Sequence, residues 1–189
     1  MEATSIQDKK KQVQAVVKTF PDFPKKGVDF VDYFSILYHP KETQLLNEIV
    51  IEAVDKHFAD AGESPFNMVI GLETRGFFLG MVLSQHYNIP FVPIRKKGKL
   101  PGETECANYA TEYEEKNAAE IQKDSINEDS KALIIDDLLA TGGTLRMAYD
   151  LVEKCGAQVA ASLVVFEICV LEGRKKLKDP SSCIAIYEY

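Results

Sequence analysis

The sequence predicts an α/β protein built on a mostly parallel sheet. Two observations carry this prediction: short apolar runs suit buried strands, and segments of helical period separate those runs. Helices that connect strands favour right-handed crossovers, which make neighbouring strands parallel. The chain has 189 residues, close to the roughly 150 that are typical of one domain. We therefore expect a single domain over residues 1–189.

The expected elements follow in chain order. A short helix over 6–19 ends at the proline-broken segment 20–24, and the aromatic-rich stretch 27–38 is irregular or a short strand. Apolar residues at helical spacing then predict a helix over 42–61, which Gly62 ends. Further strands are expected over 66–72, 89–95, 131–137, 158–166 and 183–188, with helices over 76–87 and 143–155.

Residues 97–118 are polar, contain two glycines and show no stable period, which predicts a long loop. Loops of this length are usually lids or binding loops. In parallel sheets, ligands bind beyond the carboxyl ends of the strands. That rule selects the loops at 73–76, 96–113 and 136–144.

Composition excludes several classes of protein. Hydrophobic residues make up 46% and charged residues 27%, as in an ordinary globular protein rather than a disordered tail, a collagen or a disulfide scaffold. The net charge is −7, and an acidic chain binds nucleic acid or anionic membranes poorly. We expect neither partner, so any anionic ligand needs a local cluster of positive charge.

The cysteines and histidines show neither disulfide nor metal spacing. Small buried thiols in a reduced, intracellular protein are the expected interpretation. The N-terminus has no signal-peptide pattern, and no apolar run approaches the ~18 residues of a membrane span. A cytoplasmic protein is predicted. The cysteines are Cys106, Cys155, Cys169 and Cys183, and the histidines are His39, His57 and His86.

The most informative stretch runs from Leu133 to Thr144. An apolar strand delivers Asp136 and Asp137 to its carboxyl end, and a glycine-rich turn and a helix follow. Successive backbone N–H groups and two hydroxyls of this turn can surround one phosphate at the positive end of the helix. The turn residues are Ala140, Thr141, Gly142, Gly143 and Thr144.

Two carboxylates would repel a phosphate directly. They suit the hydroxyls of a sugar, or a ligand that carries Mg²⁺, so the predicted ligand is a sugar phosphate. Neither a P-loop nor a dinucleotide-binding motif occurs in the chain. The alternative is an ordinary strand–turn–helix in which Asp136 and Asp137 form a solvated cap.

The Asp136–Thr144 segment resembles the phosphoribosyl-pyrophosphate (PRPP) motif of type I phosphoribosyltransferases. Four other stretches, in the same order along the chain, resemble the adenine-specific members of that family. The resemblance implies a three-layer fold with a central twisted, mostly parallel sheet flanked by helices. It also implies a small N-terminal hood over 1–38, a core over 39–189 and a mobile loop. The four stretches are Phe20–Phe30, Gly71–Phe77, Ile94–Gly102 and Ala107–Tyr113.

The resemblance also implies a reaction, in which adenine and PRPP give AMP and pyrophosphate. Mg²⁺ would arrive on PRPP and through water, without direct protein ligands, and the enzyme would be a homodimer. Glu112 would be the general acid/base at the purine. Phe30 would stack on adenine, Ile168 would contact its other face, and the backbone of Asp29 and Val31 would bind its edge.

A local cluster of positive charge is expected to bind the pyrophosphate. Four of them, Arg95, Lys96, Lys97 and Lys99, fall within five residues of an acidic chain. The alternative for this cluster is a solvated basic turn. For Glu112, composition alone indicates an ordinary surface acid. The loop over 97–111 is expected to be mobile until PRPP binds. Relatives hold the corresponding peptide bond in the cis form, so a cis bond is expected between Glu73 and Thr74. By resemblance, the pyrophosphate site comprises Glu73, Thr74, Arg75, Arg95, Lys96 and Lys99.

Two other functions stay open. A 6-oxopurine phosphoribosyltransferase would usually offer a lysine to the purine oxygen, and residues 166–170 contain none. A non-catalytic PRPP-binding regulator would usually add a basic DNA-binding domain. The chain also departs from its relatives: Val31 replaces a frequent arginine, Glu73-Thr74 replaces Asp-Ser, and Glu114 replaces a frequent glycine.

Overall fold

A computed structural model describes residues 5–23, 26, 29–60, 65–109 and 117–189. The chain divides into two compact units, Met1–His57 and Phe58–Tyr189, and each is described by itself. The single domain expected over residues 1–189 stays a prediction. In the described ranges, no helix combines the length and apolar character needed to cross a bilayer.

The first unit pairs two helices with a small antiparallel ribbon. Ser5 caps the first helix by accepting a hydrogen bond from the backbone N–H of Asp8. The predicted helix over 6–19 is wrong beyond Gln14, because residues 18–20 pair with a strand ten residues away, which local periodicity does not reveal. The elements are α1 (Ile6–Gln14), β1 (Lys18–Phe20), β2 (Phe30–Asp32), α2 (Phe34–Leu37) and α3 (Pro40–His57).

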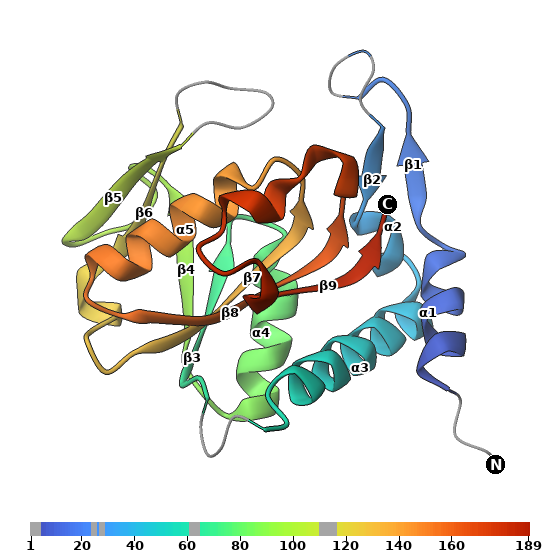
Figure 1. The fold of residues 1–189 in the computed structure, drawn as a ribbon, viewed down its shortest axis with the longest axis horizontal. Helices are drawn as coiled ribbons and strands as arrows, with labels where there is room; N and C mark the ends of the chain where they lie inside the picture. The colour runs from blue at the N-terminus through green and yellow to red at the C-terminus, as the bar shows by residue number, and fades with distance from the viewer. Residues whose placement is uncertain (1–4, 24–25, 27–28, 61–64, 110–116) are drawn as a thin grey trace. The chain divides into compact units, whose positions relative to one another are not determined.

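The second unit contains, among its described residues, a seven-stranded sheet in the order β5-β6-β4-β3-β7-β8-β9. The strands from β4 to β9 in that order run parallel, and β6 and β5 form an antiparallel edge (Figure 1). The mostly parallel sheet is therefore confirmed. The strands are β3 (Met68–Leu72), β4 (Phe91–Lys96), β5 (Thr104–Tyr109), β6 (Asn117–Gln122), β7 (Lys131–Leu139), β8 (Gln158–Glu167) and β9 (Cys183–Glu188).

Helices cover both faces of this sheet. Alternate residues of a strand point to opposite faces: Met68, Ile70 and Leu72 join the buried side of α5 (Gly143–Lys154) in one core. The other face meets α4 (Gly76–Tyr87), where Val69 lies beside Gly80. The flanked, three-layer arrangement is confirmed. Short 3₁₀ turns complete the unit: η1 (Lys123–Ser125), η2 (Cys169–Leu171), η3 (Gly173–Lys176) and η4 (Pro180–Ser182).

The chain leaves β3 and β7 in opposite directions along the sheet. From β3 it crosses through α4 to β4, and from β7 it crosses through α5 to β8 on the other side. The loops that follow these two central strands therefore diverge. Such a switch point leaves a crevice at the carboxyl ends of the strands, and this crevice positions the site described below.

The predicted loop over 97–118 is wrong where β5 and the start of β6 form a hairpin. Residues 104–109 pair with residues 117–122 in antiparallel register, and Ala107 and Ala119 are buried. The strand partner lies several residues away along the chain, and the edge position leaves many polar side chains exposed, so the local period carried no strand signal. The predicted mobility of 97–111 stays a prediction.

Replacing Gly76 by alanine is expected to destabilise the fold. A Cβ atom at Gly76 would lie 2.2 Å from the carbonyl oxygen of Ile135, which belongs to a central strand and cannot move freely. Overpacking of this kind costs about 1–3 kcal/mol, to be measured by urea unfolding. Gly80→Ala on the same helix is the matched control, because its Cβ would meet the ring of Phe91 at 2.6 Å and a side chain can shift. Equal stability of the two variants would contradict this account of the α4 contact.

Candidate active site

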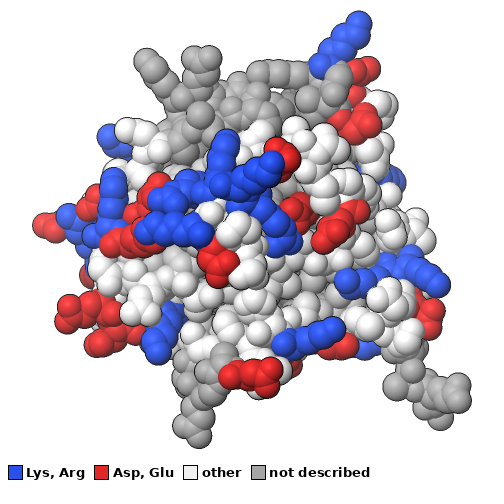
Figure 2. Space-filling model, viewed as in Figure 1, with Lys and Arg blue, Asp and Glu red and all other residues white. Residues whose placement is uncertain are grey.

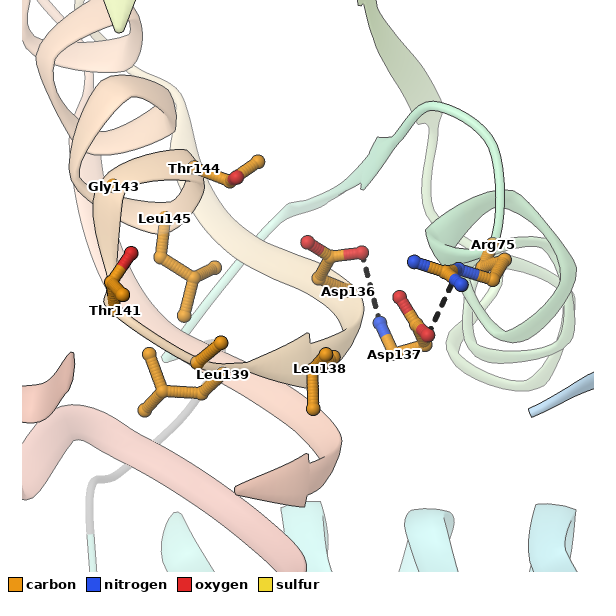
Figure 3. A pocket seen from close by; sticks show the side chains of 11 residues that line it. Arg75, Asp136, Asp137, Leu138, Leu139, Thr141, Gly143, Thr144 and Leu145 are labelled. Atoms are coloured by element: carbon orange, nitrogen blue, oxygen red, sulfur yellow. Dashed lines mark hydrogen bonds and ion pairs between the residues drawn. The ribbon is translucent and has the colours of Figure 1, made fainter. Parts of the chain in front are cut away.

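One pocket lies at the switch point between β3 and β7. It has a volume of about 170 Å³ and is lined by Arg75, from the loop after β3, and by the continuous segment Asp136–Leu145 (Figure 3). The fold thus brings Arg75 together with every residue predicted to bind the sugar phosphate. Strand β7 extends to Leu139, two residues beyond the prediction, so both aspartates lie inside the strand.

The two aspartates are almost fully buried. Asp137 Oδ2 lies 2.9 Å from Nε of Arg75, and Asp136 Oδ1 accepts a hydrogen bond of 2.9 Å from the backbone N–H of Asp137. Burial raises the pKa of Asp136 well above its usual range, and the charge of Asp137 raises it further. Burial also raises the pKa of Asp137, although Arg75 opposes that shift. Asp136 is thus the carboxylate that gains most from donors supplied by a ligand.

The glycine-rich turn joins β7 to the first residue of α5. Gly142 has φ of 77°, a left-handed conformation that favours glycine. The turn leads directly into the positive end of the helix, and the hydroxyls of Thr141 and Thr144 belong to the same pocket (Figure 3). This geometry suits a phosphate group.

Gly173 packs against this turn, a contact that the local sequence did not indicate. A Cβ atom at Gly173 would lie 2.3 Å from the carbonyl oxygen of Ala140, and one at Gly142 would lie 2.3 Å from the carbonyl oxygen of Gly173. The phosphate turn and η3 therefore touch backbone to backbone. Only the close approach of two distant segments requires glycine here, so the local sequence carried no signal for it.

Glu73 holds the start of the basic segment, residues 95–99, which begins inside the end of β4. Its Oε1 accepts a hydrogen bond of 2.9 Å from Nη2 of Arg95, and its Oε2 accepts one of 2.9 Å from the backbone N–H of Lys96. The hydrogen bond from Arg95 is the main cause that lowers the pKa of Glu73. These three residues and Thr144 all line one small hollow. The bond from Glu73 to Thr74 is cis, as expected.

The predicted cations differ in how they are held. Arg95 is fixed by Glu73, whereas the Lys96, Lys97 and Lys99 side chains form no ion pair within the described ranges and are exposed. Figure 2 shows another gathering of Lys and Arg side chains, over α5 and η3. Acidic partners offset its charge in the pairs Arg146–Asp150, Lys175–Glu172 and Lys178–Glu153. Lys96, Lys97 and Lys99 are therefore better suited to neutralise a ligand.

The residues predicted to bind the purine fall in different units. Asp29, Phe30 and Val31 belong to the first unit, where Phe30 meets the ring of Phe23 edge-on at 5.2 Å. Ile168 belongs to the second unit, where its N–H donates to the carbonyl of Leu139 at 2.9 Å. Their common role at adenine stays a prediction. Glu112, the predicted acid/base, lies outside the described residues.

Known proteins share this architecture and sequence. The family model named "Phosphoribosyl transferase domain" matches residues 35–187. An adenine phosphoribosyltransferase of Caenorhabditis elegans is 44% identical over 168 residues, which are 89% of this chain and 88% of that protein.

Solved structures agree with this relationship. Adenine phosphoribosyltransferase from Saccharomyces cerevisiae, complexed with D-2,5-dideoxy-2,5-imino-altritol 1,6-bisphosphate and adenine, superposes with a TM-score of 0.87 at 33% identity, covering 96% of this chain and 99% of that one. The Giardia lamblia enzyme, complexed with 9-deazaadenine, has a TM-score of 0.84 at 34% identity and covers 99% of both chains. A pocket built from paired aspartates, an arginine and a glycine-rich turn is thus found in a chain of matching sequence and fold, and the chain belongs to the phosphoribosyltransferase family, among its adenine phosphoribosyltransferases.

Proposed function

We propose that this chain transfers the 5-phosphoribosyl group from PRPP to adenine, giving AMP and pyrophosphate. The observation that carries the proposal is the pocket at the switch point, where a phosphate-binding turn and two buried carboxylates lie in a chain 44% identical to an adenine phosphoribosyltransferase. The reaction forms a bond between a purine nitrogen and C1 of the sugar, and it breaks the bond from C1 to the pyrophosphate oxygen.

Each part of the site has a role in this reaction. The turn Ala140–Thr144 holds the 5-phosphate, and Asp136 accepts hydrogen bonds from the sugar hydroxyls. Arg75 and the basic segment 95–99 stabilise the negative charge that develops on pyrophosphate as it leaves. Glu112 handles the proton at the purine. Closure of the segment 97–111, which includes β5, would exclude water, which otherwise hydrolyses PRPP.

Mg²⁺ is expected to arrive with PRPP. Two buried carboxylates in the pocket suit an ion that PRPP and water coordinate. Asp136 and Asp137 are the carboxylates that would hold the water shell of such an ion. When bound, the ion supplies positive charge to the departing pyrophosphate.

One assay tests the proposal against its closest alternative. Formation of AMP from adenine and PRPP is compared with formation of IMP and GMP from hypoxanthine and guanine. AMP as the dominant product supports the proposal, whereas faster IMP or GMP formation would favour a 6-oxopurine enzyme. The absence of any product together with intact PRPP binding would indicate a regulator.

The homodimer and the cytoplasmic location stay predictions.

Asp136→Asn is expected to weaken PRPP binding and to leave adenine binding nearly unchanged. A hydrogen bond to a charged group contributes roughly 1.5–3 kcal/mol, so the PRPP dissociation constant should rise about tenfold or more, as measured by calorimetric titration. Asp150→Asn is the control, because Asp150 pairs with Arg146 on the exposed side of α5. Unchanged PRPP affinity in Asp136→Asn would refute the assignment of this carboxylate to the sugar.

The same substitution is expected to stabilise the free protein at neutral pH. Asparagine keeps the acceptor for the Asp137 N–H but cannot ionise. Below the unfolded pKa of about 3.9 the aspartate is protonated in both states, so the difference in stability between the two proteins should be smallest there. As pH rises, the unfolded state ionises first, because the folded pKa of Asp136 is raised. The advantage of the asparagine variant should therefore grow with pH, by about 1.4 kcal/mol for each unit of the pKa shift, and level off above the folded pKa. Urea unfolding between pH 3 and pH 8 measures it, and a difference independent of pH would contradict the buried-charge account.

Glu112→Gln is expected to lower kcat by about 10²–10⁴, the usual loss for a missing general acid/base. PRPP affinity should change little, because the sugar phosphate site is intact. Steady-state kinetics measure the effect, and turnover within a few-fold of the unmodified enzyme would identify Glu112 as an ordinary surface acid.

A further inference from the structure

A buried acid, Glu120, lies beside the basic segment and outside the pocket. Glu120 in β6 is only 4% exposed, although it stands in a region rich in surface acids. It is directly opposite Arg95 in the antiparallel pairing of β4 with β6. Buried carboxylates are rare unless they are paired or hydrogen-bonded, so the partners of Glu120 indicate what it does.

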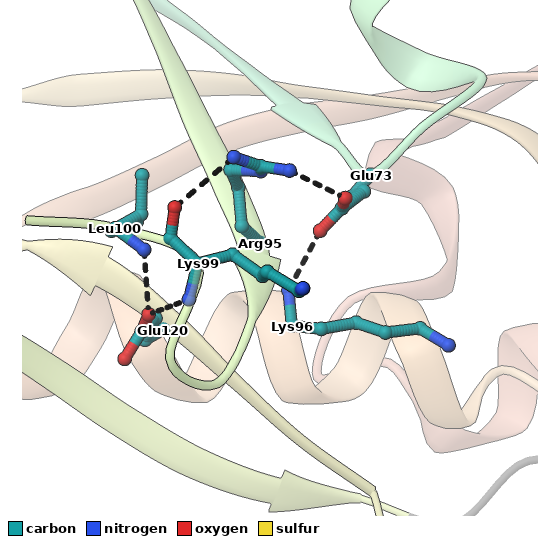
Figure 4. A network of polar contacts seen from close by, with 6 residues as sticks. All are labelled: Glu73, Arg95, Lys96, Lys99, Leu100 and Glu120. Atoms are coloured by element: carbon teal, nitrogen blue, oxygen red, sulfur yellow. Dashed lines mark hydrogen bonds and ion pairs between the residues drawn. The ribbon is translucent and has the colours of Figure 1, made fainter.

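Glu120 binds the turn that carries the lysines. Its Oε1 accepts hydrogen bonds from the backbone N–H groups of Lys99 at 2.9 Å and Leu100 at 3.0 Å (Figure 4). Its Oε2 accepts one from the hydroxyl of Thr104 at 3.1 Å. The carboxylate therefore ties both ends of the segment 99–104 to the strand β6.

The network continues to the loop after β3. The carbonyl of Lys99 accepts a hydrogen bond of 3.0 Å from Nη1 of Arg95, and Nη2 of the same guanidinium donates to Glu73 (Figure 4). Glu73 in turn accepts from the backbone N–H of Lys96. The basic turn, residues 96–100, is thus held at its first residue by Glu73 and at its last two by Glu120.

Hydrogen bonds lower the pKa of Glu120 despite its burial. Burial by itself raises the pKa of this carboxyl, but the donors from Leu100, Thr104, Lys99 and Gly98 outweigh that effect and lower the pKa. Charged acceptors make stronger hydrogen bonds than neutral ones. The energetic balance of this buried anion therefore depends on the basic turn keeping its present shape.

We infer that Glu120 is a positioning residue, which holds the basic turn in the shape that receives the pyrophosphate end of PRPP. This inference rests on the proposed function, because that function supplies the ligand. The turn and the phosphate-binding segment line one hollow, to which Arg95, Lys96 and Thr144 all contribute. A fixed backbone here directs the unpaired lysine side chains toward the same ligand and reduces the entropy lost on binding.

Simple electrostatics predicts the opposite effect of removing this charge. A negative group beside an anion site repels the anion, so its neutralisation should strengthen pyrophosphate binding. Positioning predicts weaker binding, because a turn released from Glu120 samples shapes that do not fit the ligand. The direction of the change therefore separates the two explanations.

The test is Glu120→Gln, titrated separately with inorganic pyrophosphate and with AMP in the presence of Mg²⁺. If the released turn holds the competent shape about a tenth of the time, pyrophosphate affinity falls about tenfold. AMP affinity should stay unchanged, because AMP carries the 5-phosphate but no pyrophosphate, and this result also shows that the variant is folded. Glu103→Gln is the matched control, since Glu103 is an exposed acid of the same hairpin edge.

The remaining outcomes are equally informative. Unchanged or tighter pyrophosphate binding, or equal weakening for both ligands, would overturn the positioning role. If Glu120→Gln does not fold, Thr104→Val decides, because it removes one donor to the carboxylate and should weaken pyrophosphate binding alone and by less. Failure of the unmodified protein to bind either ligand would overturn the proposed function instead.

Discussion

The ion pair between Arg75 and Asp137 spans the point where the chain turns away in opposite directions from the two central strands. Arg75 follows β3, Asp137 lies in β7, and their closest side-chain atoms are 2.9 Å apart. Without this contact the crevice would lose the cation that compensates a buried carboxylate on its opposite wall. Buried ion pairs contribute little net stability, but the loss of one partner is costly. The pair therefore joins the loop after β3 to β7, the strand that leads into the phosphate turn.

Placing two carboxyl groups side by side in the site destabilises their charged forms in the folded protein. Asp136 and Asp137 are adjacent and buried, so both resist ionisation, and the donor that Asp136 receives at 2.9 Å is an uncharged backbone N–H. The proposed ligand, with sugar hydroxyls and a cation, would relieve this repulsion and so convert part of the strain into affinity. The basic turn is organised in the opposite way. Its backbone is held by the acids Glu73 and Glu120, while its lysine side chains stay available.

Local sequence patterns predicted the parts of the fold that repeat locally. The apolar runs predicted as strands over 66–72 and 131–137 contain the buried strands β3 and β7, and the helix of α3 follows its apolar spacing. The hairpin of β5 and β6 was missed because its strands are polar at an edge and are stabilised by each other. The short strand β1 was assigned to a helix for the same reason, since its stability comes from β2. Glu120 was not distinguishable from neighbouring acids, because its burial depends on a turn about twenty residues earlier.

The sequence by itself determined the chemistry of this protein: paired aspartates before a glycine-rich turn, a cluster of cations, and a family resemblance over most of the chain. Such features are local, and each residue type has its own donors, acceptors and charge wherever the chain places it. Only the tertiary structure decided which of them meet. It set Arg75 against Asp137, paired Glu73 with Arg95, and packed Gly173 against the phosphate turn. These contacts join segments far apart in sequence, and their energies arise from close approach, burial and alignment, which no local pattern encodes.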